Sequence, residues 1–195
     1  MSKKQIKLSK TLSSILRHNL INLGLNCDEQ GFVKVSDLVA KGLISCTIDE
    51  LKAVVDSSEK QRFALEHRGD EDYFIKANQG HSADVGALLG DEVCLEPIVE
   101  PLPFCAHGTE RRFLETINQR GLHRMKRKHI HFVSEIKPTE QVSGFKAKSN
   151  TIIVIDMQEC MKDGMKFFKS ANGVILTEGF DGWVDAKYFL DVTDL

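Results

Sequence analysis

Three prolines near the middle of the chain constrain its organisation more than any other sequence feature. Pro97, Pro101 and Pro103 fall within seven residues. Because proline fixes φ and lacks a backbone N–H donor, such a run favours an extended connector between folded parts. A chain of 195 residues suits two small lobes. We therefore predict a first domain over residues 1–96 and a second over residues 97–195.

The first half of the chain shows the pattern of short helices followed by a hairpin. Leu8, Leu12 and Leu16 recur at helical spacing. Thr47, with Glu50 three residues later, forms a capping box at the start of a further helix. The predicted elements are helices over residues 6–20, 36–41 and 48–57, a strand over 31–35, and hairpin strands over 62–66 and 73–77. This is the arrangement of a winged-helix module, which binds nucleic acid in some proteins and protein partners in others.

The second half shows mainly strand patterns and one clear helix, which follows Thr109 and extends to Gln119. Strands are predicted over residues 130–133, 152–155, 167–168, 174–176 and 183–184, with turns at 172–173 and 181–182. No G-x-G-x-x-G sequence follows a strand, so a Rossmann dinucleotide site is not supported. We predict an α+β protein with an N-terminal winged-helix lobe and a mostly-β C-terminal lobe.

Basic side chains gather in two segments, although the net charge of the chain is only −2. Residues 1–17 contain lysines such as Lys7 and Lys10 but no acid, and residues 111–128 contain seven basic residues and one acid, Glu115. Each run alone is typical of a solvated surface. Together with the polar motifs described next, they favour local contact with an anionic partner such as nucleic acid.

The cysteines and the hydropathy pattern restrict the compartment. The chain has five cysteines, an odd number, and none forms a C-x-x-C pair, which argues against a disulfide framework or a zinc site. The N-terminus lacks the apolar core of a signal peptide, and no apolar run is long enough to cross a bilayer. We expect a soluble, cytoplasmic protein with no membrane partner, and we favour a monomer.

Two pairs of polar residues are candidates to bind or react with a phosphate. Arg17 and His18 end the first predicted helix beside its apolar stripe. An arginine holds a phosphate through two hydrogen bonds, and a histidine transfers a proton near neutral pH. A solvated helix cap is the alternative interpretation. Lys60 and Arg62 lie at the entry to the hairpin, where charged side chains also serve to protect a strand edge.

Hydrogen-bonding side chains also follow the hairpin. Asn78, Gln79 and His81 surround Gly80, which permits close approach of the backbone. A simple turn would have a similar composition. Further on, His129 and His131 point to the same face of a strand, as metal ligands do, but no third ligand lies nearby in the sequence. We therefore expect no metal and a site for an anionic ligand instead.

The strings that carry these residues resemble the RNA 2′-phosphotransferase family. The matching strings are residues 9–18, 61–63, 77–82, 107–109, 121–125 through 129–132, and 173–177. Their joint order over nearly the whole chain is highly specific, although no single string is. Lys76 departs from the family pattern, in which arginine is common, and lysine lacks the planar fork of a guanidinium.

The resemblance implies a bilobed enzyme. The N-terminal winged-helix lobe would bind RNA, and the C-terminal lobe would resemble ADP-ribosyltransferases and bind NAD⁺. An RNA 2′-phosphate, as found at a tRNA splice junction, attacks the nicotinamide ribose, and the ribose 2″-hydroxyl then attacks the phosphorus. The products are nicotinamide, RNA with a 2′-hydroxyl, and ADP-ribose 1″,2″-cyclic phosphate. NAD⁺ is thus a co-substrate, and the partner is an RNA that bears a 2′-phosphate, with tRNA one candidate.

The resemblance also implies which residues act. The family's catalytic Arg-His-Arg-Arg set corresponds to Arg17, His18, Arg62 and Arg127. The residues expected to contact NAD⁺ are His107, Gly108, Thr109, Gly121, Arg124, His129 and His131. Those expected to contact RNA are Lys7, Lys10, Lys60, Lys76, Asn78, Gln79 and His81.

Two other functions compete with this one. An ADP-ribosyltransferase that stops after the first step would act on a protein or on a nucleic-acid phosphate. Many such enzymes need a catalytic glutamate, for which Glu178 is a weak candidate. A winged-helix regulator without catalysis is the second, but it leaves residues 107–109 and 127–131 unexplained.

Overall fold

The computed structural model describes residues 2–58, 60–69, 72–89, 95–135 and 148–195. The chain forms two compact units, Met1–Cys94 and Leu95–Leu195, here called the first and second unit. The boundary predicted from the proline run lies between residues 96 and 97.

The first unit begins with a long helix that changes type before it ends. Helix α1 (Lys3–Ser14) starts at a capping box formed by Ser2 and Gln5, and it continues as a π-helical turn, η1 (Ile15–Asn19). The predicted helix over residues 6–20 is therefore present, but it starts earlier because Ser2 caps it. The π-helical turn was not predicted, since apolar spacing does not distinguish it from an α-helix.

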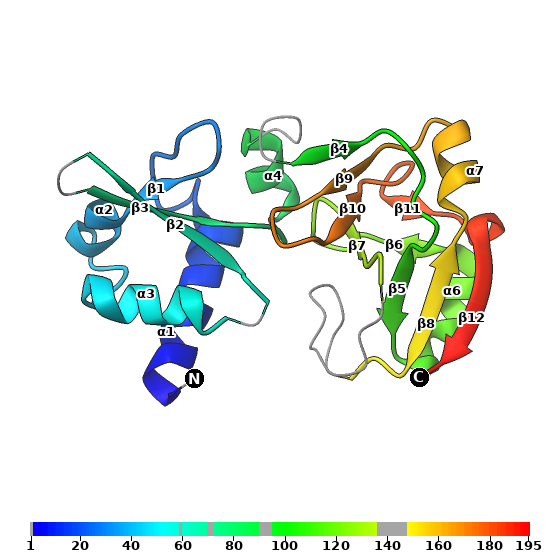
Figure 1. Ribbon diagram of the computed structural model, residues 1–195, viewed down its shortest axis with the longest axis horizontal. Helices are drawn as coiled ribbons and strands as arrows, with labels where there is room; N and C mark the ends of the chain where they lie inside the picture. Colours follow the sequence, from blue (N-terminus) through cyan, green and yellow to red (C-terminus); the bar gives the residue numbers. More distant parts are fainter. Residues whose placement is uncertain (1, 59, 70–71, 90–94, 136–147) are drawn as a thin grey trace. The chain divides into compact units, whose positions relative to one another are not determined.

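The rest of the first unit packs around one apolar core. Figure 1 shows the order of its elements. Its sheet has the order β1-β3-β2 and is antiparallel. The elements are β1 (Val33–Lys34), β2 (Phe63–Arg68), β3 (Asp72–Ala77), α2 (Val35–Ala40), α3 (Ile48–Asp56) and α4 (Ala83–Leu89). The capping box of Thr47 and Glu50 is confirmed. Helix α4 was not predicted; it buries Val85 and Leu89 in this core.

The second unit is built mainly from strands. One antiparallel sheet contains β4 (Glu96–Ile98), β9 (Phe167–Lys169), β10 (Ile175–Thr177) and β7 (Ile130–Phe132) in that order. Another contains β12 (Phe189–Asp194), β8 (Thr151–Ile155) and β5 (Ala106–Thr109), and β11 (Trp183–Val184) pairs with β6 (Leu122–His123). The helices are α6 (Leu114–Arg120) and α7 (Met157–Lys162), and two short 3₁₀ turns are η2 (Arg111–Phe113) and η3 (Ala186–Tyr188).

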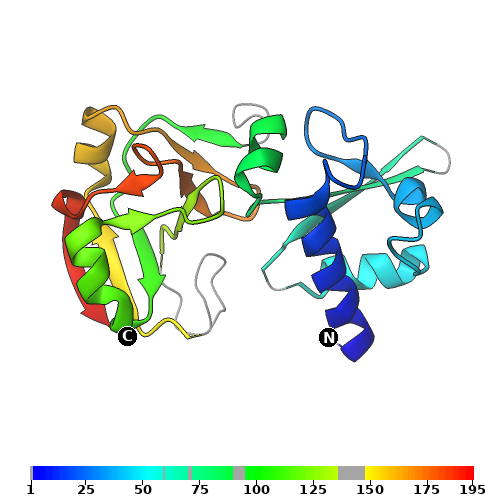
Figure 2. The same ribbon diagram turned by 180° about the vertical axis from the view of Figure 1, so that it is seen from behind.

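Helix α6 covers one face of the β5–β8–β12 sheet, as the views from both sides show (Figures 1 and 2). The mixture of helices and antiparallel sheets confirms the predicted α+β class.

Several elements of the second unit differ from the sequence prediction. The proline run does not begin as a plain connector, because Glu96–Ile98 forms strand β4. Pro97 is tolerated there because β4 is an edge strand, in which a residue without an N–H donor need not interrupt the hydrogen bonds between strands. Strands β5 and β12 and helix α7 were also not predicted. Among the described residues, no helix is both long and apolar enough to span a membrane.

Candidate functional site

Arg17 and His18 lie in the π-helical turn η1, and contacts from far along the chain hold this turn. The carbonyl of Arg17 accepts hydrogen bonds from the backbone N–H of Ser82, at 2.9 Å, and from its hydroxyl, at 3.1 Å. The Nε and Nη2 atoms of Arg17 are buried. Its guanidinium lies against Gly80, where an added Cβ would be 3.3 Å from Nη1. Arg17 therefore has little freedom to change its orientation.

Arg62 is held at the entry to β2. Its Nη1 donates to the hydroxyl of Ser58 at 3.2 Å, and its carbonyl accepts from the N–H of Asn78 at 3.0 Å. The side-chain amide of Asn78 donates in turn to the carbonyl of Gln61 at 2.6 Å. Gln61 has φ +40, a conformation that non-glycine residues rarely adopt, so the backbone is strained just before Arg62.

The segment 78–82 thus joins the predicted catalytic residues of the first unit. Its first residue binds the backbone at Arg62, and its last binds the backbone of Arg17. The single hydroxyl proton of Ser82 is shared between the carbonyl of Arg17 and the carboxylate of Asp84. The bond to Asp84, followed by the backbone N–H groups and His18, lowers the pKa of Asp84. Segment 78–82 therefore connects the turn of Arg17 and His18 with Arg62.

The lysines predicted to bind RNA occupy different surroundings. Lys7 and Lys10 are exposed on α1. Lys76 alternates along β3 with core-facing residues and places its Nζ 4.5 Å from the centre of the Phe32 ring. Lysine can make such a cation–π contact without a planar guanidinium. Of the remaining predicted RNA contacts, Gln79 is buried, and Lys60, Asn78 and His81 are half-buried.

Three predicted histidines of the second unit form a connected series. The Nδ1 of His107 on β5 lies 2.8 Å from the carbonyl of His131 on β7, and the Nδ1 of His131 lies 3.1 Å from the carbonyl of His129. A carbonyl only accepts hydrogen bonds, so each Nδ1 carries the proton. The Nε2 of each ring is then an acceptor when the ring is neutral.

His131 is kept neutral by its surroundings. Its side chain is 5% exposed. Burial is the main cause that lowers the pKa of His131 well below that of a free imidazole, and the positive charge of Arg127 lowers it further. Burial also lowers the pKa of Arg127, although its side chain still contacts solvent. Arg127 and His131 therefore share one environment in the second unit.

Three other predicted NAD⁺ contacts are small residues in closely packed backbone. Gly108 and Thr109 are buried on β5. Gly121 has φ +86, and an added Cβ would lie 2.4 Å from the carbonyl of Val184, so no larger residue fits there. Among the described residues, no group of three or more His, Cys, Asp or Glu side chains is placed to hold a metal ion.

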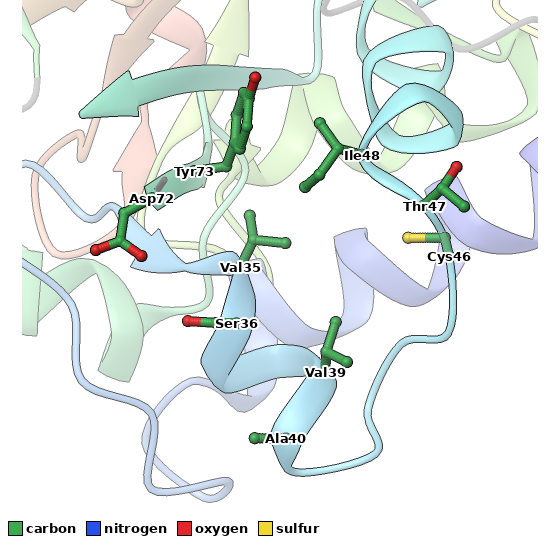
Figure 3. Close-up of a pocket in the computed structure, with 9 residues that line it drawn as sticks. All are labelled: Val35, Ser36, Val39, Ala40, Cys46, Thr47, Ile48, Asp72 and Tyr73. Atoms are coloured by element: carbon green, nitrogen blue, oxygen red, sulfur yellow. The ribbon is translucent and has the colours of Figure 1, made fainter. Parts of the chain in front are cut away.

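A separate pocket of about 460 Å³ lies in the first unit, between α2, the start of α3, and β3 (Figure 3). Its lining is Val35, Ser36, Val39, Ala40, Cys46, Thr47, Ile48, Asp72 and Tyr73, which includes none of the predicted site residues. Thr47 caps α3, and Asp72 pairs with Lys34 at 2.8 Å. Thr47 and Asp72 thus serve the fold, and the lining contains no arginine or histidine for phosphate chemistry.

Sequence reasoning missed several residues that build these clusters. Ser58 and Ser82 bind the side chain of Arg62 and the backbone of Arg17, and Gly182 lies against the side chain of Arg124. The partners of Ser82 and Gly182 are distant in sequence, whereas Ser58 is only four residues from Arg62. Only the identity of Ser82, inside the string 77–82, gave any signal.

A comparison with known proteins identifies the family. A family model described as "RNA 2'-phosphotransferase, Tpt1 / KptA family" matches residues 3–179. The chain belongs to the RNA 2′-phosphotransferase family. It is 38% identical to tRNA 2′-phosphotransferase 1 of Danio rerio over 90% of this chain and 79% of the relative. It is 39% identical to a probable RNA 2′-phosphotransferase of Agrobacterium fabrum, over 87% of each chain.

Membership of the RNA 2′-phosphotransferase family confirms the resemblance drawn from the ordered strings. The match spans both compact units, from residue 3 in the first to residue 179 in the second. A relative from Homo sapiens, named tRNA 2′-phosphotransferase 1, is 36% identical and aligns with 98% of this chain and 77% of its own length. Members with animal and bacterial names thus align with most of the chain.

Proposed function

We propose that this protein is an NAD⁺-dependent RNA 2′-phosphotransferase. It removes an internal 2′-phosphate from RNA, such as the one at a tRNA splice junction, and transfers it to NAD⁺. The names of its relatives support a transferase that acts on RNA 2′-phosphates. In this proposal the first unit is a winged-helix lobe that binds RNA, and the second is an ADP-ribosyltransferase-like lobe that binds NAD⁺.

The observation that carries the proposal is the cluster around segment 78–82. It ties Arg17, with a largely buried guanidinium, to Arg62, whose guanidinium is anchored on Ser58. Two held guanidiniums suit a phosphate dianion, because their geometry is set before the substrate arrives. We propose that Arg127 is the third guanidinium that acts on this phosphate.

The reaction proceeds in two balanced steps. First, an oxygen of the RNA 2′-phosphate forms a bond to C1″ of the nicotinamide ribose, and nicotinamide leaves with the electron pair of the broken C–N bond. Second, the ribose 2″-hydroxyl attacks the phosphorus and loses its proton, and the RNA 2′-oxygen leaves and gains a proton. The products are ADP-ribose 1″,2″-cyclic phosphate and RNA with a 2′-hydroxyl.

The residues divide these tasks by their chemistry. The nucleophile of the first step is already anionic, so it needs positioning more than deprotonation. The second step builds negative charge on a phosphorane, which guanidiniums stabilise directly. His18 is the member of the set that exchanges a proton near neutral pH, so we assign it to orient or deprotonate the 2″-hydroxyl.

The histidines of the second unit fit a dinucleotide. Because the Nδ1 of His107 donates to a carbonyl, the Nε2 of the neutral ring is an acceptor, which suits a ribose hydroxyl rather than a phosphate oxygen. Gly108 and Thr109 follow on the same strand, and Gly121, His129 and His131 complete the proposed NAD⁺ contacts. Asn78, Gln79 and His81, with Lys7, Lys10, Lys60 and Lys76, would contact RNA.

An ADP-ribosyltransferase that stops after the first step is the competing function. Its usual catalytic carboxylate would have to be Glu178, but Glu178 lies 3.6 Å from the Nζ of Lys128. Because this ion pair engages the candidate carboxylate of the competing function, we favour the complete two-step reaction.

Incubation of the protein with NAD⁺ and an oligoribonucleotide bearing one internal 2′-phosphate tests the proposal. We expect release of nicotinamide and RNA with a 2′-hydroxyl, without added divalent metal. Accumulation of RNA joined to ADP-ribose as the final product would identify the competing function. Release of inorganic phosphate without NAD⁺ would contradict both, and a requirement for Zn²⁺ or Mg²⁺ would contradict the metal-free mechanism.

A further inference from the structure

Arg124 lies on the turn that carries Arg127, and its side chain is bound to that turn. Its Nη1 donates to the carbonyl of Arg127 at 2.8 Å, and the N–H of Arg127 returns a bond to the carbonyl of Arg124 at 3.2 Å. A guanidinium that is bound to its own turn in this way has fewer donors left for a ligand. The bond therefore braces the turn from which Arg127 extends.

Gly182 provides the surface on which this brace rests. The N–H of Arg124 donates to the carbonyl of Gly182 at 3.0 Å. A Cβ added to Gly182 would lie 2.7 Å from the Nε of Arg124 and 3.3 Å from its Cδ and Cγ. The arginine stem therefore lies flat over the glycine, and even a methyl group would displace it.

The far end of the turn is held by an ion pair. Lys128 follows Arg127, and its Nζ lies 3.6 Å from the Oε1 of Glu178. The Lys128 side chain is only 13% exposed, whereas Met125, at the tip of the turn, is 73% exposed with φ +59. The turn is thus anchored at both ends and exposed between them, and Arg127 projects from the exposed part.

We propose that Arg124 is a positioning residue, which uses Gly182 as its seat to fix the turn from which Arg127 acts on the phosphate. This inference rests on the proposed function, because it takes Arg127 as a group that touches the substrate. It also gives Arg124 a different task from the NAD⁺ contact expected from the sequence. The step that should depend on it most is the second, where Arg127 would stabilise the charge of the phosphorane.

Limited trypsin digestion of folded protein tests the brace without any measurement of activity. Gly182→Ala should displace Arg124 and raise the cleavage rate after Lys126 and Arg127 by about tenfold, since local opening exposes the turn. Gly164→Ala is the matched control: its φ is +97, close to the +88 of Gly182, but no atom lies within 4 Å of its added Cβ. Equal cleavage of the two variants would overturn the inference.

Kinetics of Arg124→Met then separate a positioning role from direct binding. A displacement of Arg127 by about 1 Å should slow the second step on the order of 10²-fold, with accumulation of RNA joined to ADP-ribose. The Kd for NAD⁺ should stay unchanged, and adding Gly182→Ala to Arg124→Met should cause little further loss. An increase in the Kd for NAD⁺ as large as the kinetic loss would show that Arg124 contacts the dinucleotide, which would overturn the inference.

Different results would refute the proposed function and the positioning role of Arg124. A wild-type protein that transfers no phosphate would refute the proposed function, whereas the digestion experiment would still give its own result on the brace. An active wild type, with the same step rates in Gly182→Ala and Gly164→Ala, would refute the positioning role alone.

Discussion

Arg17 in the first unit and Arg127 in the second are predicted to serve the same phosphate, but they are held in different ways. The Nε and Nη2 atoms of Arg17 are buried, and its guanidinium itself rests on Gly80. The Arg127 side chain reaches solvent, although burial also lowers the pKa of its guanidinium, and the neighbouring Arg124 is the one that rests on a glycine, Gly182. The first unit therefore holds its arginine directly, whereas the second holds the backbone that carries it.

This difference has a chemical consequence. A directly held guanidinium is ready before the substrate binds, which favours capture of the RNA phosphate. A guanidinium on an exposed turn retains freedom to follow the phosphorus as the second bond forms. We therefore predict that variants that loosen Arg17 alter RNA capture and that variants of the Arg127 turn alter the second step.

The largest expected effect is that of Arg62→Ala. The side chain is anchored by Ser58 at 3.2 Å, so its removal deletes a preset donor to the phosphorane. We expect the second step to slow by roughly 10²–10³-fold, about 2.7–4 kcal/mol, and the first step to slow much less. A rapid-quench time course should show RNA joined to ADP-ribose. Equal slowing of both steps without this adduct would reduce Arg62 to a substrate-binding residue.

The next effect concerns the basic face of α1. Lys7 and Lys10 are exposed on this helix. The double variant Lys7→Ala/Lys10→Ala removes two phosphate contacts. It should weaken RNA binding roughly 15-fold at 0.15 M salt, and the slope of log K against log salt concentration should become less steep by roughly 1.4. Filter binding across salt concentrations measures both. Lys41→Ala, an exposed lysine outside α1, is the control, and an equal loss there would leave α1 without a special role.

His131 provides a pH test of the second unit. Its folded pKa is lowered, so the unfolded chain binds a proton first as the pH falls, and stability is lost below a pH of about 6.5. The loss should approach roughly 1.4 kcal/mol per pH unit until the folded pKa is reached. His131→Asn keeps an N–H donor but does not titrate, so its urea unfolding should depend less on pH between 7.5 and 5.5. The same pH dependence in both proteins would assign the effect to other groups.

The smallest expected effect is that of Gly80→Ala, which is compared with Gly182→Ala. At Gly80 an added Cβ would be 3.3 Å from Arg17, against 2.7 Å from Arg124 at Gly182. Because the shift needed is a few tenths of an ångström, Gly80→Ala should slow phosphotransfer only roughly three- to fivefold. Gly42→Ala, with φ +67 and open space around the added Cβ, controls for backbone strain. A larger loss for Gly80→Ala than for Gly182→Ala would reverse the comparison.

Sequence patterns identified those parts of the fold that depend on near neighbours. The capping box at Thr47 and the hairpin of β2 and β3 were predicted because their signals lie within a few residues. The π-helical turn at Arg17 was not, since a contact with Ser82, 65 residues away, holds it. The ordered strings named the candidate residues, but a string contains no information on which guanidinium is buried and which is exposed.

The same limit explains the corrections in the second unit. Pro97 suggested a connector, but it lies in strand β4, which pairs with β9 at the edge of the sheet. An edge strand tolerates proline, and the sequence alone does not show which strand is at an edge. The family strings assigned Arg127 to catalysis and Arg124 to NAD⁺ contact. The positioning role proposed for Arg124 could not be predicted, because Gly182, which lies against its side chain, is more than 50 residues further on.

The central claim, that the first unit binds the RNA phosphate and the second binds NAD⁺, is tested most directly by crossed titration calorimetry. Lys7→Ala/Lys10→Ala and His107→Ala would each be titrated with NAD⁺ alone and with a 2′-phosphorylated oligoribonucleotide alone. We predict that the lysine variant loses affinity only for RNA and that His107→Ala, which removes the Nε2 acceptor, loses affinity only for NAD⁺. Equal losses for both ligands in either variant would contradict the division of function between the two units.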